Sequence, residues 1–140
     1  MPSLFTRIID GELPGRFVWR DAHCVAFLSI APLRPGHLLV VPRAEVDHWI
    51  DLDDALAAHL MVVSRTLGVA LQTAFEPTKV GLTILGLEVR HAHLHLVPMR
   101  SEADMNFANA DANARGEDLE AAAEKIRAAL RDAGASGVSE

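Results

Sequence analysis

The sequence predicts an α+β domain, in which an antiparallel β-sheet carries a long central helix and a C-terminal helix. Three features support this prediction: short apolar segments bounded by turn residues, a long segment with helical apolar spacing, and a histidine-rich segment with two-residue alternation. With 140 residues, the chain is long enough for one domain with its own core. We therefore expect residues 1–140 to form a single domain.

The first third of the chain is predicted to form strands. Residues 17–20 and 24–28 are apolar and are separated by turn residues. A connection containing proline and glycine then leads to a third strand at 37–41. The only cysteine, Cys24, lies in the second segment, where we expect a buried strand residue rather than a reactive thiol.

The middle of the chain is predicted to form a long helix followed by two paired strands. Acidic residues at 51–54 favour a helix N-terminus, and the helix is expected to end before Pro77. A strand at 79–85, a turn at 86–88 and the histidine segment then predict an antiparallel pair. A final amphipathic helix is predicted over about 117–132, and both helices are expected on one face of the sheet. The apolar residues with helical spacing in the long helix are Leu56, Leu60, Val63, Leu67 and Leu71.

Composition argues against several classes of function. The net charge is −6 and there is no tract rich in lysine or arginine, so neither nucleic acid nor an anionic membrane is an expected partner. No run of residues looks long and apolar enough to span a bilayer, and residues 1–7 lack the pattern of a signal peptide. We therefore expect a soluble, cytoplasmic protein.

Five cations fall near the glycine and histidine segments, and they leave two interpretations open. They could belong to an ordinary solvated surface, or they could form a positive opening that attracts a phosphorylated small molecule. The five residues are Arg34, Arg43, Lys79, Arg90 and Arg100.

Three histidines alternate with apolar residues at His91, His93 and His95. Because side chains alternate between the faces of a strand, the three imidazoles are expected on one face, about 6.5–7 Å apart at the backbone. Such a group could hold zinc with His37 as a further ligand. Alternatively, a neutral imidazole could attack an electrophilic phosphate and form a covalent phosphoramidate. The remaining interpretation is an exposed sheet face on which the three histidines have no catalytic or metal-binding role.

The histidine segment resembles the signature of the histidine triad (HIT) family, His-φ-His-φ-His-φ-φ, where φ is apolar. Here the segment reads His-Ala-His-Leu-His-Leu-Val at 91–97 and is followed by Pro98. Segments 4–14 and 27–43 are similar to the family's N-terminal segment and central strand pair. The resemblance covers most of residues 4–100. It implies a homodimeric, HIT-like α+β protein that binds nucleotides and hydrolyses or transfers nucleoside monophosphates.

The resemblance also implies roles for individual residues. His93 would be the nucleophile that attacks the α-phosphorus of a phosphoramidate, a dinucleotide polyphosphate or a similar substrate, giving a nucleotidyl-histidine intermediate. His91 and His95 would bind phosphate oxygens and orient His93, while His37 would pack behind the triad. No metal or cofactor is required. The residues that would enclose the base and sugar are Leu4, Phe5, Ile8, Phe27, Ile30 and Leu39.

Two departures from the family pattern concern zinc and ribose. Many members hold a structural zinc with two N-terminal cysteines and a later histidine, but Ser3, Thr6 and Glu45 stand at these positions. We therefore expect no such zinc. Ser29 replaces an aspartate that usually binds the ribose hydroxyls, and a serine cannot make the same charged contact.

A third departure precedes the triad. The family usually has Gly-Gln-Ser/Thr-Val, whereas residues 86–89 read Gly-Leu-Glu-Val, a form similar to that of a bacterial sub-branch which also carries Met-x-Phe, here 105–107. Glu88 could serve as a catalytic acid if it stays protonated, whereas its carboxylate would repel a phosphate. The departures leave an alternative function open, a nucleotide-binding or scaffold protein with little or no turnover.

Overall fold

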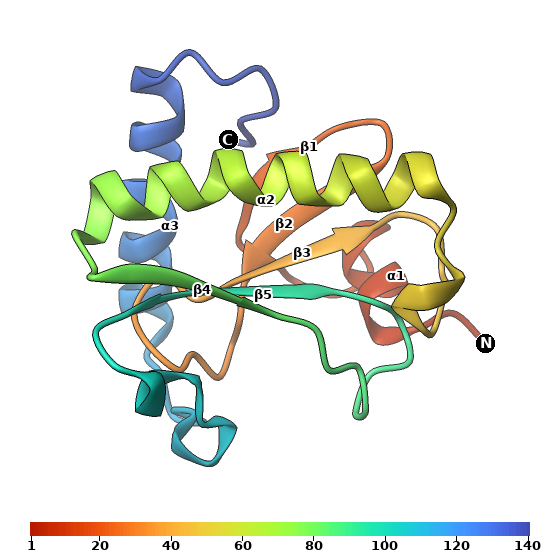
Figure 1. Ribbon diagram of the computed structural model, residues 1–140, viewed down its shortest axis with the longest axis horizontal. Helices are drawn as coiled ribbons and strands as arrows, with labels where there is room; N and C mark the ends of the chain where they lie inside the picture. Colours follow the sequence, from red (N-terminus) through yellow and green to blue (C-terminus); the bar gives the residue numbers. More distant parts are fainter.

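The computed structural model describes residues 1–140 and contains one five-stranded sheet (Figure 1). The strand order is β1-β2-β3-β5-β4, and every neighbouring pair is antiparallel. The predicted α+β fold is therefore confirmed. The strands are β1 (Phe17–Arg20), β2 (Cys24–Leu28), β3 (Leu38–Pro42), β4 (Lys79–Thr83) and β5 (Leu94–Met99).

Helices α2 (Asp54–Phe75) and α3 (Gly116–Asp132) lie against one face of this sheet (Figure 1). The Asp53 carboxylate caps α2 by accepting the Leu56 amide, and α2 ends where Glu76 adopts a left-handed conformation. Between the helices and the sheet lies the larger hydrophobic core, which also contains the fully buried Cys24. Its most deeply buried large side chains include Leu38, Leu60, Leu67, Leu71, Leu96, Ile126 and Leu130.

The sequence-based expectation that no segment could span a bilayer is wrong for α2. This helix has 22 residues and is, by length and composition alone, apolar enough to cross a membrane. In the structure, however, its residues Leu60, Leu67 and Leu71 pack into the core. The apolar residues on the sheet-facing side of α2 are therefore explained by their burial in the core between this helix and the sheet.

The opposite face of the sheet carries α1 (Leu4–Ile9), a short helix that the sequence analysis did not predict (Figure 1). The prediction that the helices cover one face thus holds for α2 and α3 but not for α1. A second, smaller core lies beneath α1, and the Ser3 side chain caps this helix by accepting the Thr6 amide. The buried members of this core are Phe5, Phe17, Val25, Phe27, Leu39 and Val41.

The two strands predicted near the histidines are shorter than expected. β4 ends at Thr83 and β5 begins at Leu94, so a ten-residue connection replaces the predicted turn at 86–88. Two hydrogen bonds explain the late start of β5. The Ala92 amide donates to the Val46 carbonyl, and the Pro42 carbonyl accepts from a histidine ring. These groups are therefore not free to extend the ladder between β3 and β5.

The two edges of the sheet differ. The amide of Arg20 donates to the Gly137 carbonyl, and the amide of Ser139 donates to the Val18 carbonyl. Residues 137–139 thus cover the outer edge of β1, whereas β4 has no strand on its outer side.

Candidate active site

The four histidines that the sequence singled out meet on the sheet face that carries α1. Only His95 lies within β5; His91 and His93 lie in the segment just before it, and His37 lies just before β3. All four are buried. The ring centroids of His93 and His95 are 4.8 Å apart, and those of His37 and His95 are 5.2 Å apart. The structure therefore brings the predicted residues together, although the strand holds only one member of the triad.

A chain of hydrogen bonds defines the proton positions on His37 and His95. The Leu33 amide donates to Nδ1 of His37 over 3.0 Å, so a neutral His37 carries its proton on Nε2. This Nε2 lies 3.0 Å from Nδ1 of His95 and donates to it. A neutral His95 must then carry its proton on Nε2, which has no partner within the protein. His95 therefore presents an N–H donor to the site.

His93 carries its proton on the other ring nitrogen. Its Nδ1 lies 2.8 Å from the carbonyl oxygen of His91, and a carbonyl can only accept, so Nδ1 carries the proton. The Nε2 of a neutral His93 is consequently an unprotonated nitrogen with a free lone pair. A potential nucleophile thus stands beside the hydrogen-bond donor of His95.

Burial keeps these imidazoles neutral. Desolvation, followed by the charge of neighbouring His93, lowers the pKa of His37 to about 4. Desolvation and the charges of His93 and His37 lower the pKa of His95 to about 3. Desolvation also lowers the pKa of His93 below its ordinary value. At neutral pH these three rings are therefore in the state that nucleophilic attack on phosphorus needs.

His91 differs from its two neighbours because both of its ring nitrogens are already used. Nε2 donates to the Pro42 carbonyl over 2.7 Å, and Nδ1 lies 2.6 Å from Oγ of Ser3. With a fully buried ring, His91 has no nitrogen left for a phosphate oxygen, so the expectation of that contact is wrong. Its carbonyl nevertheless orients His93.

The same hydrogen bonds argue against a metal centre built from His91, His93 and His37. The nitrogens of His91 and of His37 are all engaged by protein groups, which leaves only one free nitrogen in that set.

An apolar surface adjoins His93 on the side of α1. Phe5 places its ring 4.7 Å from that of His93 and 5.6 Å from that of Phe27, both edge to face. Phe5, Phe27 and Leu39 are buried, and Ile8 packs against them. Leu4 and Ile30 are exposed, Ile30 to 76%, and neither belongs to this core.

Two of the predicted polar site residues make no hydrogen bond to the histidine side chains. Ser29 is half-buried, and its Oγ accepts the Ala31 amide over 3.3 Å, while its own amide donates to the His37 carbonyl. Glu88 is exposed and makes no hydrogen bond or ion pair. A backbone hydrogen bond therefore holds Ser29 next to His37, whereas the Glu88 side chain has no hydrogen bond or ion pair with the rest of the protein.

Sequence reasoning missed two groups that contact the site. Phe107, in the 3₁₀ turn Phe107–Asn109, places its ring 4.8 Å from that of His95 and so covers one side of the triad. The Met-x-Phe motif at 105–107 was a signal for this residue. The Leu33 amide has no sequence signal, because any residue other than proline would supply it.

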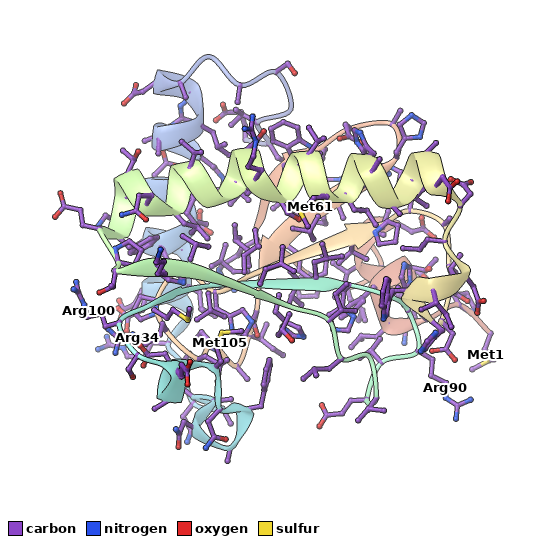
Figure 2. All side chains as sticks on the ribbon, viewed as in Figure 1. Met1, Arg34, Met61, Arg90, Arg100 and Met105 are labelled. Atoms are coloured by element: carbon purple, nitrogen blue, oxygen red, sulfur yellow. The ribbon has the colours of Figure 1, made fainter.

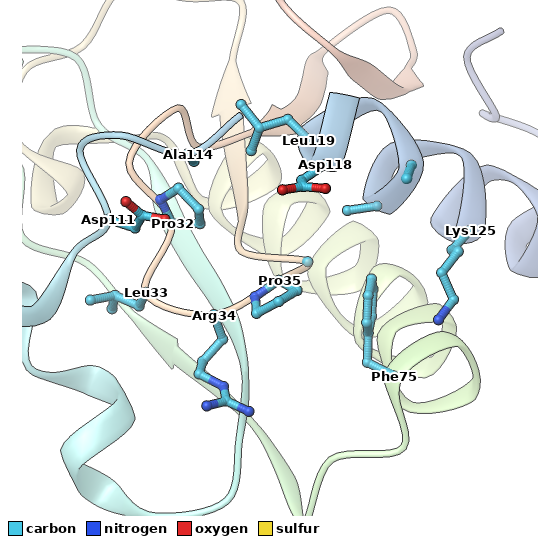
Figure 3. A pocket seen from close by; sticks show the side chains of 13 residues that line it. Pro32, Leu33, Arg34, Pro35, Phe75, Asp111, Ala114, Asp118, Leu119 and Lys125 are labelled. Atoms are coloured by element: carbon cyan, nitrogen blue, oxygen red, sulfur yellow. The ribbon is translucent and has the colours of Figure 1, made fainter. Parts of the chain in front are cut away.

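A cavity of about 460 Å³ has no histidine among its lining residues (Figure 3). Its walls are the 32–36 loop, Phe75 and α3, and none of the predicted site residues lines it. Figure 2 shows Arg34 and Arg100 near one end of the sheet and Arg90 near the other. These cations do not gather at one opening, so the ordinary-surface interpretation fits them better.

One other group brings metal-ligating atoms together. Single ligand atoms of Asp21, Cys24 and His59 lie within 4.8 Å of one another. Asp21 already accepts hydrogen bonds from the Trp19 indole, from two backbone amides, from the thiol and, over 2.7 Å, from His59. This cluster therefore ties the β1–β2 turn to α2 without needing a metal.

Comparisons with known proteins agree with this geometry. Residues 10–102 match the family model of the HIT domain. An uncharacterized HIT-like protein from Methanocaldococcus jannaschii is 35% identical over 105 residues, which are 72% of this chain and 81% of that protein. The protein named Hit from Bacillus subtilis is 32% identical over 108 residues, covering 72% of this chain and 73% of that protein.

Solved structures share the fold. A Hit-like protein from Bartonella henselae superposes with a TM-score of 0.80 at 27% identity, covering 91% of this chain and 96% of that chain. A zinc-bound histidine triad protein from Mycobacterium smegmatis has a TM-score of 0.80 at 24% identity, covering 94% of each chain. The triad, the sheet that carries it and these matches together show that the chain belongs to the HIT family.

Proposed function

We propose that this protein hydrolyses or transfers nucleoside monophosphates through a covalent intermediate on Nε2 of His93. Membership of the HIT family implies nucleotide binding and hydrolase or transferase activity at the level of the family. The observation that carries the finer proposal is the hydrogen bond from Nδ1 of His93 to the His91 carbonyl, which leaves Nε2 as the free nitrogen.

In the first step, the Nε2 lone pair of His93 forms a bond to the α-phosphorus. The bond from phosphorus to the leaving group breaks, and the leaving group departs with the electron pair and takes a proton from solvent. The imidazole ring then carries a positive charge, which the His91 carbonyl stabilises at Nδ1–H. The Nε2–H of His95 donates to a phosphate oxygen, where charge develops.

In the second step, water or another acceptor attacks the phosphorus on the same intermediate. The bond between phosphorus and Nε2 breaks, and its electron pair returns to His93. The attacking water loses a proton to solvent, and the nucleoside monophosphate leaves. In this proposal Phe5, Phe27 and Leu39 form the apolar wall against which the base or sugar packs, and Ser29 makes at most one ribose contact.

The test is the His93→Ala variant assayed on a nucleoside phosphoramidate and on a dinucleoside polyphosphate. We expect turnover to fall to the uncatalysed rate, because the other ring nitrogen without a protein partner, Nε2 of His95, carries a proton and has no lone pair for attack. Wild-type protein quenched during turnover should gain the mass of one nucleoside monophosphate, and the variant should not. His48→Ala, which removes an exposed histidine outside the site, is the matched control. Release by His93→Ala at the wild-type rate would overturn the proposal.

The alternative is a nucleotide-binding or scaffold protein with little turnover. Ser29 offers no carboxylate to the ribose, and Glu88 is unattached, which favours this alternative. Tight nucleotide binding by wild-type protein with no turnover of any substrate would support it in place of the hydrolase.

We also propose that the protein is a homodimer formed through β4 and α2. The outer edge of β4 is unpaired, and Leu82 on this strand is exposed. Exposed Met61, Val62 and Val69 share one face of α2. A Cβ at Gly68 beside them would lie 3.9 Å from Val80 of β4, so the two surfaces adjoin each other. Val69→Arg should shift the molar mass in light scattering from dimer to monomer. Leu87→Arg, a matched change in an exposed loop, should not. A cytoplasmic location stays a prediction.

A further inference from the structure

The site holds a second hydrogen-bonded group, which we call the N-terminal latch: Ser3, Thr6, Glu45 and His91. One carboxylate oxygen of Glu45 accepts the Ser3 amide over 2.6 Å and the Thr6 hydroxyl over 2.7 Å. The Ser3 hydroxyl accepts the Thr6 amide over 3.0 Å and lies 2.6 Å from Nδ1 of His91. The latch therefore links the start of α1, the residues after β3 and the segment before β5.

The directions of these bonds determine the tautomer of His91. Its Nε2 must donate, because its partner is the Pro42 carbonyl. Nδ1 of the neutral ring is then an acceptor, and the single hydroxyl proton of Ser3 points to it. The longer 3.2 Å approach of the Ser3 hydroxyl to the Thr6 hydroxyl cannot use the same proton. The Thr6 hydroxyl donates its proton to the carboxylate of Glu45, so every donor in the latch has a defined acceptor.

The donor set of the latch does not fit a structural zinc. Zinc sites of this kind use thiolate, imidazole and carboxylate ligands, whereas Ser3 and Thr6 offer neutral hydroxyls that are already hydrogen-bonded. Nδ1 of His91 is taken by Ser3 as well. The residues at the positions where the family resemblance implies zinc ligands are thus joined by hydrogen bonds instead.

We propose that Ser3, Thr6 and Glu45 are positioning residues, which replace a metal by a hydrogen-bonded latch that fixes His91 and, through its carbonyl, the nucleophile His93. This inference rests on the proposed function of His93. Two contacts connect the latch to that ring. The His91 carbonyl accepts Nδ1–H of His93, and α1 carries Phe5, whose ring contacts both histidine rings with centroids 5.8 Å and 4.7 Å apart.

The hydrogen bonds to Glu45 favour its ionised form. The Ser3 amide and then the Thr6 hydroxyl lower the pKa of Glu45 below its ordinary value, so this carboxylate stays ionised as an acceptor. The titratable groups that face the latch are Glu45 itself and His91, whose two ring nitrogens contact Ser3 Oγ and the Pro42 carbonyl.

Ser3→Ala is the first test, because it removes the hydroxyl that donates to His91; the same change removes the cap of α1, since this hydroxyl also accepts the Thr6 amide. We expect kcat to fall about tenfold, the loss that corresponds to one net hydrogen bond. Nitrogen NMR of the His91 ring should show that Nδ1 has lost its hydrogen bond. Ser3→Thr keeps a hydroxyl and should recover most of both signals. Ser101→Ala, which removes another serine at a helix N-terminus, is the matched control and should change neither.

The second test uses zinc itself. Wild-type protein dialysed after incubation with zinc should retain none at the latch. One zinc per chain that is lost in Ser3→Ala would overturn the proposal, as would unchanged His91 spectra in a folded Ser3→Ala protein. The NMR measurements need no substrate. If His93→Ala were active but the His91 spectra changed as expected, the proposed nucleophile would be wrong and the latch would still stand as a structural device.

Discussion

Lowering the pH from about 8 to about 5 should destabilise this protein strongly, and the buried histidines explain why. In the unfolded chain, His37 and His95 bind protons below their ordinary pKa of 6.5. In the folded protein they stay neutral until pH falls to about 4 and about 3, respectively. Between these limits the unfolded state binds more protons, so the free energy of unfolding rises with pH and is lost as pH falls.

The expected size follows from the two groups. Each contributes about 1.4 kcal/mol per pH unit below its unfolded pKa. At pH 5 the two together should therefore remove about 4 kcal/mol of the free energy of unfolding, a large part of the roughly 5–15 kcal/mol of an ordinary domain. The lowered pKa of His93 acts in the same direction. Protonation of carboxylates contributes mainly at still lower pH, where their ordinary pKa values lie.

Urea unfolding followed by tryptophan fluorescence at a series of pH values measures this slope. In His37→Asn, the slope between pH 6.5 and 5 should fall by about 1.4 kcal/mol per unit, because one of the two groups no longer titrates. His48→Ala, outside the site, should keep the slope of the wild type. A free energy of unfolding that is the same at pH 5 and pH 8, or a His37→Asn slope equal to that of the wild type, would refute the reasoning.

Two further predictions concern stability elsewhere in the fold. Gly36→Ala should lower the free energy of unfolding in urea more than Gly134→Ala does. Both glycines have positive φ, which alone costs a residue with a side chain about 1–2 kcal/mol. Only at Gly36 would the new Cβ also meet the Phe75 ring, at 2.6 Å. Equal losses would show that the contact is relieved freely. Arg127→Met should cost about 1–3 kcal/mol by leaving a buried carbonyl of β1 without its donor, whereas Arg131→Met breaks only exposed ion pairs and should cost under about 1 kcal/mol. Similar values for the two arginines would contradict this account.

Most of the fold could be predicted from periodicity, and the exceptions have local causes. The apolar spacing in α2 and the turn residues around β1 and β2 sufficed, because these elements bury regular faces. The six-residue α1 is too short to show a helical period, and its stability comes from the contacts of Phe5 with the sheet. The late start of β5 depends on which groups Pro42 and Ala92 bond to, and alternation in the sequence cannot reveal those partners.

The site was predictable in its members more than in their bonds. Alternation placed three histidines together with His37 as a possible further ligand, and the resemblance placed His37 behind the triad and added the apolar wall. Neither the alternation nor the resemblance could show that both ring nitrogens of His91 bond to protein groups. The partners, Ser3 and the Pro42 carbonyl, are 88 and 49 residues away along the chain. The position of the proton on His95 likewise depends, through His37, on the backbone amide of Leu33. Nearly every residue has such an amide, so the sequence gives no signal for it.

The unequal edges of the sheet limit how the protein can associate. Exposed strand edges are templates for further pairing, and in many proteins they lead to aggregation. Here residues 137–139 occupy the hydrogen-bonding groups of β1, so only the edge of β4 can accept another strand. In the homodimer proposed above, two copies would pair through β4 about a two-fold axis, and both covered edges would be outermost. Growth by strand addition would then end at two chains, because the open edge that could start a fibre would be paired in a closed assembly.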